Sequence, residues 1–193
     1  KSGYFYSAAY HRLADGTITR IRTIVPNTTL IYSVMQNAGR SYATGLDITL
    51  SQDITKLFSF NLNLNGYHNR LNAFTVLNKY PQETTYSSPT RQIFSGNAKL
   101  NTFFHLPLKF EIQLSAIYLA PDLIPQGKIG HRFALNLGVK KVIQKGKGEL
   151  FLNATDLANT MVAREDIRGN GFNYVGYDYY ETQVIRIGYS YKF

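Results

Sequence analysis

The chain has 193 residues, a formal net charge of +9, 15 Tyr, 12 Phe and no Cys. The missing cysteines exclude a disulfide framework and a thiolate metal site. The sequence contains no run of about 18 apolar residues, the length that would predict a transmembrane helix. The positive charge does not indicate nucleic-acid binding, because the Lys and Arg residues are spread over predicted turns and loops and no nucleic-acid-binding motif accompanies them.

Alternation of apolar and polar residues runs through most of the chain and predicts β-strands with one apolar and one polar face. The clearest case is residues 58–65, where Phe and Leu alternate with Ser and Asn. Tyr4, Tyr6, Ala8 and Tyr10 likewise share one face of the first strand. About 9–11 residues of this kind are enough to cross a bilayer. In chain order the eight predicted strands are residues 4–10, 42–50, 58–65, 94–104, 110–118, 133–140, 149–155 and 185–193.

The predicted connections alternate between short and long. Outer-membrane barrels have this arrangement, with short periplasmic turns and longer extracellular loops, whereas a soluble sandwich has no reason for it. With the even strand count, it predicts an all-β fold: an antiparallel up-and-down transmembrane β-barrel with about eight strands present. Short turns are expected at 51–57, 106–109 and 143–148, and long loops at 13–32, 73–92, 119–130 and 156–181.

Two segments of the long connections do not follow the alternation. Residues 119–125 contain two prolines, which break a strand ladder. Residues 156–167 carry Leu157, Ala158 and Met161 at helical spacing. We predict that both segments are loops, the second with room for one helical turn.

The last strand ends at the C-terminal residue of the sequence with an aromatic side chain. It resembles the closing strand of bacterial outer-membrane barrels, whose final aromatic residue is part of the signal read by the insertion machinery. The residues carrying this resemblance are Ile185, Ile187, Tyr189, Tyr191 and Phe193. The alternative is an edge strand of a soluble sheet.

The order of three motifs resembles the C-terminal part of a TonB-dependent outer-membrane receptor of the type common in Bacteroidetes. The motifs are Asn37-Ala38-Gly39 with Thr44-Gly45-Leu46-Asp47, then residues 150–159 (LFLNATDLAN), then residues 189–193 (YSYKF). The resemblance implies the outer membrane of a Gram-negative bacterium and import of a scarce solute: a metal chelate, a vitamin, a glycan or a peptide. It implies as partners outer-membrane lipid and lipopolysaccharide, the remainder of the receptor with its plug, TonB, and the barrel-insertion machinery.

Receptors of this kind close about 22 strands around a plug. We therefore expect residues 1–193 to be a single barrel segment that lacks the plug domain and the N-terminal signal. Two other functions stay open. One is a self-contained eight-stranded barrel serving as an adhesin, a surface anchor or a membrane enzyme. The other is a soluble β-sandwich carbohydrate-binding module, which would bury Phe58, Phe60, Leu62 and Leu64 in a protein core.

No catalytic constellation, cofactor motif or metal-ligand pattern stands out, so we expect a protein without enzymatic activity, cofactor or metal. A tyrosine-rich part of the last loop offers flat, amphipathic surface for stacking on sugars or siderophore rings; an aromatic girdle at the barrel rim is the alternative. Asparagines on the polar faces, such as Asn65 and Asn97, are candidates to line a solute path or to hydrate a polar interior. The candidate ligand-binding residues are Arg164, Arg168, Asn170, Tyr174, Tyr177, Asp178, Tyr179 and Tyr180.

Overall fold

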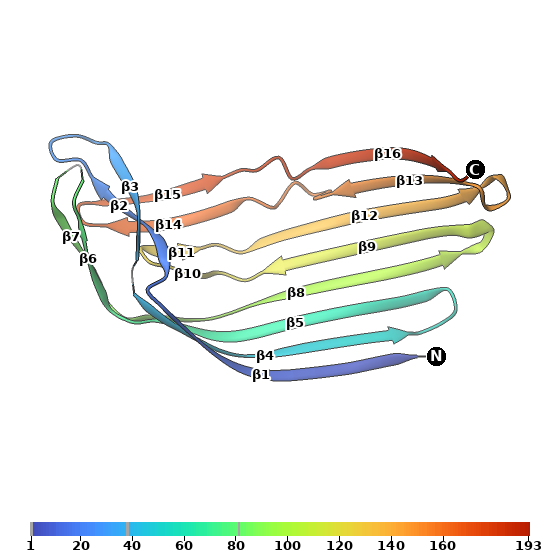
Figure 1. Ribbon diagram of the computed structural model, residues 1–193, viewed down its shortest axis with the longest axis horizontal. Helices are drawn as coiled ribbons and strands as arrows, with labels where there is room; N and C mark the ends of the chain where they lie inside the picture. Colours follow the sequence, from blue (N-terminus) through green and yellow to red (C-terminus); the bar gives the residue numbers. More distant parts are fainter. Residues whose placement is uncertain (1, 38, 81) are drawn as a thin grey trace.

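The computed structural model describes residues 2–37, 39–80 and 82–193, so Ala38 of the Asn37-Ala38-Gly39 motif lies outside the described residues. Eight long strands form one antiparallel sheet in the order β1-β4-β5-β8-β9-β12-β13-β16 (Figure 1). No helix in the described part of the chain is long and apolar enough to cross a membrane. The strands are β1 (Gly3–Asp15), β4 (Arg40–Asp53), β5 (Phe58–Leu71), β8 (Arg91–Leu106), β9 (Phe110–Leu119), β12 (Arg132–Ile143), β13 (Gly148–Thr155) and β16 (Val184–Tyr191).

The eight strands and the up-and-down order that the sequence predicts are confirmed. The three short turns lie together at one end of the sheet, the end at which both termini lie (Figure 1). Two of these turns are the 3-10 segments η1 (Pro107–Lys109) and η2 (Gln144–Gly146). The sheet is open: among the described residues, β1 pairs only with β4 and β16 only with β13.

The long connections are not loops, as the sequence suggested, but mostly short strands at the other end of the sheet (Figure 1). Residues 122–124 nevertheless form a short strand. Pro121 and Pro125 flank this strand and lie outside it, and the strand pairs on one side only, a position in which proline is tolerated. Residues 156–167 contain no helical turn; β14 begins at Ala163. The additional strands are the hairpins β2 (Ile18–Ile24) with β3 (Ile31–Asn37) and β6 (Phe74–Asn78) with β7 (Thr84–Ser88), and a four-stranded sheet of β10 (Asp122–Ile124), β11 (Gly127–Ile129), β14 (Ala163–Gly169) and β15 (Phe172–Asp178).

The register gives the eight-stranded sheet one apolar and one polar face. Ile48, Leu64 and Ala98 are aligned across β4, β5 and β8, and the adjacent row is Asp47, Asn65 and Asn97. We call these sides the apolar face and the polar face. The side chains that a soluble sandwich would bury remain partly exposed, and no second layer among the described residues covers them. These side chains are Phe58, Phe60, Leu62 and Leu64.

The tyrosines of β1 lie on the polar face. Tyr4 is paired with Ser51 and Tyr6 with Thr49. Both partners lie on the same face of β4 as Asp47, because alternate residues of a strand share a face. Periodicity shows that residues share a face, but only the pairing with β4 shows which face it is.

The short strands of the long connections pack together, and we call them the loop cap. Its apolar cluster is Ile21, Val76 and Tyr86, with Phe74 against it. The large buried apolar side chains of the protein thus lie mainly in the loop cap and not in the eight-stranded sheet.

Gln126 joins two parts of the loop cap. Its Oε1 accepts a hydrogen bond from the backbone N–H of Arg22 at 2.6 Å, and its Nε2 donates to the carbonyl oxygen of Arg22 at 2.9 Å. The guanidinium of Arg22 also bonds Glu165 at 2.8 Å. Because β2 carries Arg22 and β14 carries Glu165, these contacts dock the first hairpin on the four-stranded sheet.

We expect Gln126→Ala to loosen the loop cap without unfolding the eight-stranded sheet. Gln126 is 1% exposed, and removal of its side chain leaves the part-buried N–H and carbonyl groups of Arg22 without this partner, a cost of about 1 kcal/mol each. Limited proteolysis should then cut the long connections faster, while gel mobility still changes on heating as for a folded barrel. Gln92→Ala, at an exposed position of β8, is the control, and equal cleavage of both variants would contradict the prediction.

Candidate functional site

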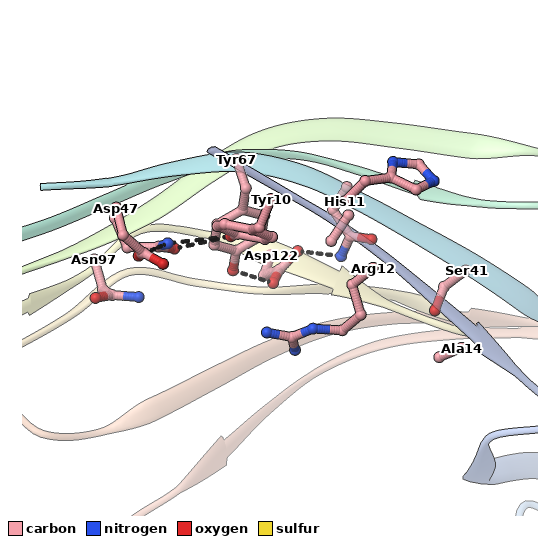
Figure 2. Close-up of a pocket in the computed structure, with 12 residues that line it drawn as sticks. Tyr10, His11, Arg12, Ala14, Ser41, Asp47, Tyr67, Asn97 and Asp122 are labelled. Carbon is pink, nitrogen blue, oxygen red and sulfur yellow. Dashed lines mark hydrogen bonds between the residues drawn. The ribbon is translucent and has the colours of Figure 1, made fainter. Parts of the chain in front are cut away.

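A cavity of about 800 Å³ opens on the polar face, toward the loop-cap end of the sheet (Figure 2). Its walls come from four neighbouring strands and from the first residue of β10. Because strand side chains alternate, Tyr10, Arg12 and Ala14 of β1 contribute to it from one face, whereas His11 borders it but belongs to the apolar face by its pairing with Thr44. The lining residues are Tyr10, His11, Arg12, Ala14, Ser41, Ala43, Asp47, Asn65, Tyr67, Asn69, Asn97 and Asp122.

Gly45 makes room for one of these side chains. It pairs with Tyr10 across β1 and β4, and a Cβ atom on Gly45 would lie 2.6 Å from the Tyr10 hydroxyl oxygen. With hydrogen in that place, the Tyr10 ring crosses β4 and its hydroxyl accepts a hydrogen bond from Asn65 Nδ2 at 3.1 Å. Asn65 also donates to Asp47. The glycine of the Thr44-Gly45-Leu46-Asp47 motif therefore shapes the cavity floor.

Asp122 connects the loop cap to the sheet. Its Oδ2 accepts a hydrogen bond from the Tyr67 hydroxyl at 2.6 Å, and its Oδ1 accepts from Asn69 Nδ2 at 2.8 Å and from the Leu123 N–H at 2.7 Å. Figure 2 shows the Asp122 carboxylate meeting Tyr67 from below the sheet. The cavity is thus bounded by a fixed carboxylate on its cap side.

Arg12 brings positive charge to the cavity. It makes no ion pair with any residue that the structure describes, and its guanidinium lies 5.9 Å from the centre of the Tyr10 ring. Guanidinium, carboxylate, amide and phenol groups line one space, so the cavity offers donors and acceptors to a hydrophilic solute.

A second cavity of about 500 Å³ lies on the polar face at the short-turn end. Lys140 stands there between two carboxylates on neighbouring strands, 3.1 Å from Glu111 and 3.8 Å from Glu149. Phe103 and Phe151 supply apolar surface beside them. Because these charges already pair with each other, this cavity offers fewer unpaired groups than the first.

The turn after β13 is organised by the buried carboxylate of Asp156. It accepts hydrogen bonds from the N–H groups of Thr160 (3.0 Å) and Met161 (3.1 Å) and from the Thr182 hydroxyl (2.6 Å). Its own N–H donates to Asn136 Oδ1 at 2.8 Å. Burial alone would raise the pKa of Asp156, but the three hydrogen bonds outweigh it and hold this pKa below its usual range. This turn includes the Asp-Leu-Ala-Asn end of the second motif.

The sequence-predicted ligand residues lie together on β14, β15, the turn between them and the two residues after β15, and none of them lines the first cavity. Arg164 pairs with Asp166 at 3.1 Å, Asn170 donates to the carbonyl of Thr85 at 3.1 Å, and Tyr179 donates to Asn159 at 2.9 Å. The remaining candidates also sit on this hairpin or directly after it: Arg168, Tyr174, Tyr177, Asp178 and Tyr180. Their role in ligand binding stays a prediction.

Sequence reasoning found two residues of the cavity, Asn65 and Asn97, and missed most of the others. The alternation that groups Tyr4, Tyr6 and Tyr10 continues to Arg12, so this signal was available. Asp122 carried no such signal, because its contacts to Tyr67 and Asn69 join residues more than 50 positions apart.

The residues predicted to form an insertion signal lie on the apolar face of β16, where Ile185, Ile187, Tyr189 and Tyr191 align with residues of β13; their role in insertion stays a prediction. Phe193 follows the end of the strand, and its ring centre lies 5.5 Å from that of Tyr191, edge to face.

A sequence model of one protein family matches residues 1–191, and this family is described as an outer membrane protein beta-barrel family. No curated protein and no solved structure matches the chain.

Proposed function

Because this chain belongs to the outer membrane protein beta-barrel family, we propose that its sheet is part of the wall of a TonB-dependent receptor in the outer membrane of a Gram-negative bacterium. The receptor would import a scarce solute: a metal chelate, a vitamin, a glycan or a peptide. The mechanism is binding and gated passage, with no bond made or broken. In such a barrel the apolar face meets lipid, the polar face meets the lumen and the long connections are extracellular.

The dimensions of the apolar face support this orientation. Ten residue steps separate Phe58, near the short turns, from His68, near the loop cap. At about 3.4 Å per residue and a tilt of 35–45°, they span roughly 25 Å along the membrane normal, the height of the apolar band of an outer-membrane barrel.

The observation that carries the proposal is the polar cavity between the lumen wall and the loop cap. A hydrophilic solute arriving from the extracellular side meets it after passing the loop cap. Arg12, Asp47 and Asn69 offer it a cation, an anion and an amide in one space. The candidate residues of β14 and β15 lie on the same side of the membrane, where they would contact the solute first.

Among the described residues, β1 and β16 each leave one edge of the sheet without a partner strand. A hydrocarbon layer does not accommodate an open sheet edge, so each edge needs a partner strand. We propose that the remainder of the receptor supplies both, and that its plug fills the lumen and receives energy through TonB. Outer-membrane lipid and lipopolysaccharide would surround the wall, and the insertion machinery would read β16.

Solute uptake by the full-length protein tests this function. A strain that lacks the chromosomal gene and expresses it from a plasmid is offered radiolabelled iron chelates, cobalamin, oligosaccharides and peptides, with and without TonB. We expect TonB-dependent uptake of one class, reduced about tenfold by Arg12→Gln, which removes a charged hydrogen-bonding group. Arg91→Gln, at a position outside the cavity, is the control. Uptake of no class, or uptake that does not need TonB, would contradict the proposal.

A further inference from the structure

A groove of about 340 Å³ lies on the apolar face at its loop-cap end, opposite the cavity already described. The register places His11, Thr44 and His68 in one row across β1, β4 and β5, with Tyr42 and Arg70 in the next row toward the loop cap. His11 Nδ1 and Thr44 Oγ1 are 2.8 Å apart. The lining residues are His11, Tyr42, Thr44, His68, Arg70 and Asn72.

The groove begins where the apolar band ends. The next outward residues toward the short turns are Leu46, Ile48 and Leu50. Beside the groove, Phe94 is 84% exposed and its ring centre lies 4.8 Å from that of His68. Exposed aromatic rings are typical of the boundary between acyl chains and headgroups. The groove therefore faces the headgroup layer of the outer leaflet.

Arg70 gives the groove an unneutralised positive charge. It is exposed, and it has no ion pair with any residue in the described part of the chain. The neighbouring cation Arg40, one row closer to the loop cap, is paired with Asp15 at 2.6 Å. The groove itself is lined by no carboxylate, and its hydroxyl, amide and imidazole groups add further hydrogen-bonding sites.

We infer that this groove binds a phosphate group of a phosphorylated glycolipid of the outer leaflet, such as lipopolysaccharide. Arginine binds phosphate oxygens in two parallel hydrogen bonds, and Asn72 and Tyr42 lie within the same groove to meet the attached sugar. The apolar band directly below receives the acyl chains. This occupant matches both the charge and the position of the groove. The inference rests on the outer-membrane location given in the proposed function, and not on which solute the lumen carries.

Binding of lipid A to the full-length protein in zwitterionic detergent tests the inference. Native mass spectrometry titrates wild type, Arg70→Gln and Arg91→Gln with bisphosphorylated lipid A, with chemically dephosphorylated lipid A and with inorganic phosphate. Arg91 has the same charge at the same height, but it lies on the polar face next to Gln92, the partner of Arg70. Heat-modifiable mobility confirms that each variant is folded.

We expect Arg70→Gln to weaken binding of bisphosphorylated lipid A about tenfold, the loss of one charged hydrogen-bonded pair. Arg91→Gln should bind bisphosphorylated lipid A with the affinity of wild type. Dephosphorylated lipid A should bind wild type weakly, with about the affinity of Arg70→Gln for the bisphosphorylated lipid. Equal affinity of Arg70→Gln and wild type would overturn the inference, as would equal binding of the two lipids. Inorganic phosphate that binds as tightly as the lipid would make this a site for free phosphate and would also overturn it.

Discussion

Replacing Asp156 by Ala is expected to destabilise the last hairpin of the sheet by about 3 kcal/mol, because it removes a buried carboxylate that is the common acceptor of three donors. The side chain is 2% exposed, so water cannot replace it readily. Its loss leaves the N–H groups of Thr160 and Met161 and the hydroxyl of Thr182 without this partner. Since Thr182 leads into β16, the strand that ends the sheet is affected directly. Urea unfolding followed by heat-modifiable gel mobility measures the change.

Asp178→Ala is the matched control for this prediction. Asp178 is the same residue type on the same long connection, but its side chain is exposed. Its replacement should change the unfolding midpoint little. Equal midpoints for the Asp156 and Asp178 variants would show that the carboxylate does not organise the turn.

The same carboxylate gives the protein a defined response to acid. Because the pKa of Asp156 is lower in the folded than in the unfolded state, its contribution to stability is fully present above the unfolded pKa of about 3.9. It is lost as the pH falls through the folded pKa. Wild type should therefore lose more stability than Asp156→Asn when the pH is lowered from 5 to about 3, as measured by urea unfolding at each pH.

The strands of the sheet could be predicted because their signal is local. Residues 58–65 alternate strictly, since over this part of β5 one face is apolar and the other polar. The loop cap lacks such a signal. β10 has three residues between two prolines, and its position depends on β11 and on the contacts of Asp122 with β5. These contacts join residues that are far apart in the sequence, so the pattern of any single segment does not predict them.

The turn at Asp156 could not be predicted for a related reason. Leu157, Ala158 and Met161 have helical spacing, but the Asp156 carboxylate takes the N–H groups of Thr160 and Met161 that a helix would use. Side-chain hydrogen bonds of Asp to nearby backbone commonly compete with helix formation in this way. Asp156, the first residue of the Asp-Leu-Ala-Asn element, thus replaces the predicted helical turn by a turn built on its own side chain.

The strands that pair with the free edges of β1 and β16 distinguish a receptor wall from a self-contained barrel. The two strands run antiparallel, and both termini lie at the short-turn end (Figure 1), so eight strands could close on themselves by pairing these edges. The 193 residues contain no Cys, so paired cysteines can be introduced without a background from this segment. Phe5→Cys combined with Ile187→Cys or Tyr189→Cys places thiols on the apolar face of both edges.

In the full-length protein we expect neither pair to form a disulfide, because β1 and β16 would each pair with another strand of a larger barrel. A disulfide requires Cα atoms about 4.4–6.8 Å apart, a separation that only neighbouring strands offer. Phe5→Cys with Leu50→Cys, directly paired in β1 and β4, is the positive control and should oxidise completely. Efficient crosslinking of Phe5→Cys to β16 would show an eight-stranded barrel. A lumen of that width is filled by side chains, so this result would also remove the solute path from the proposed function.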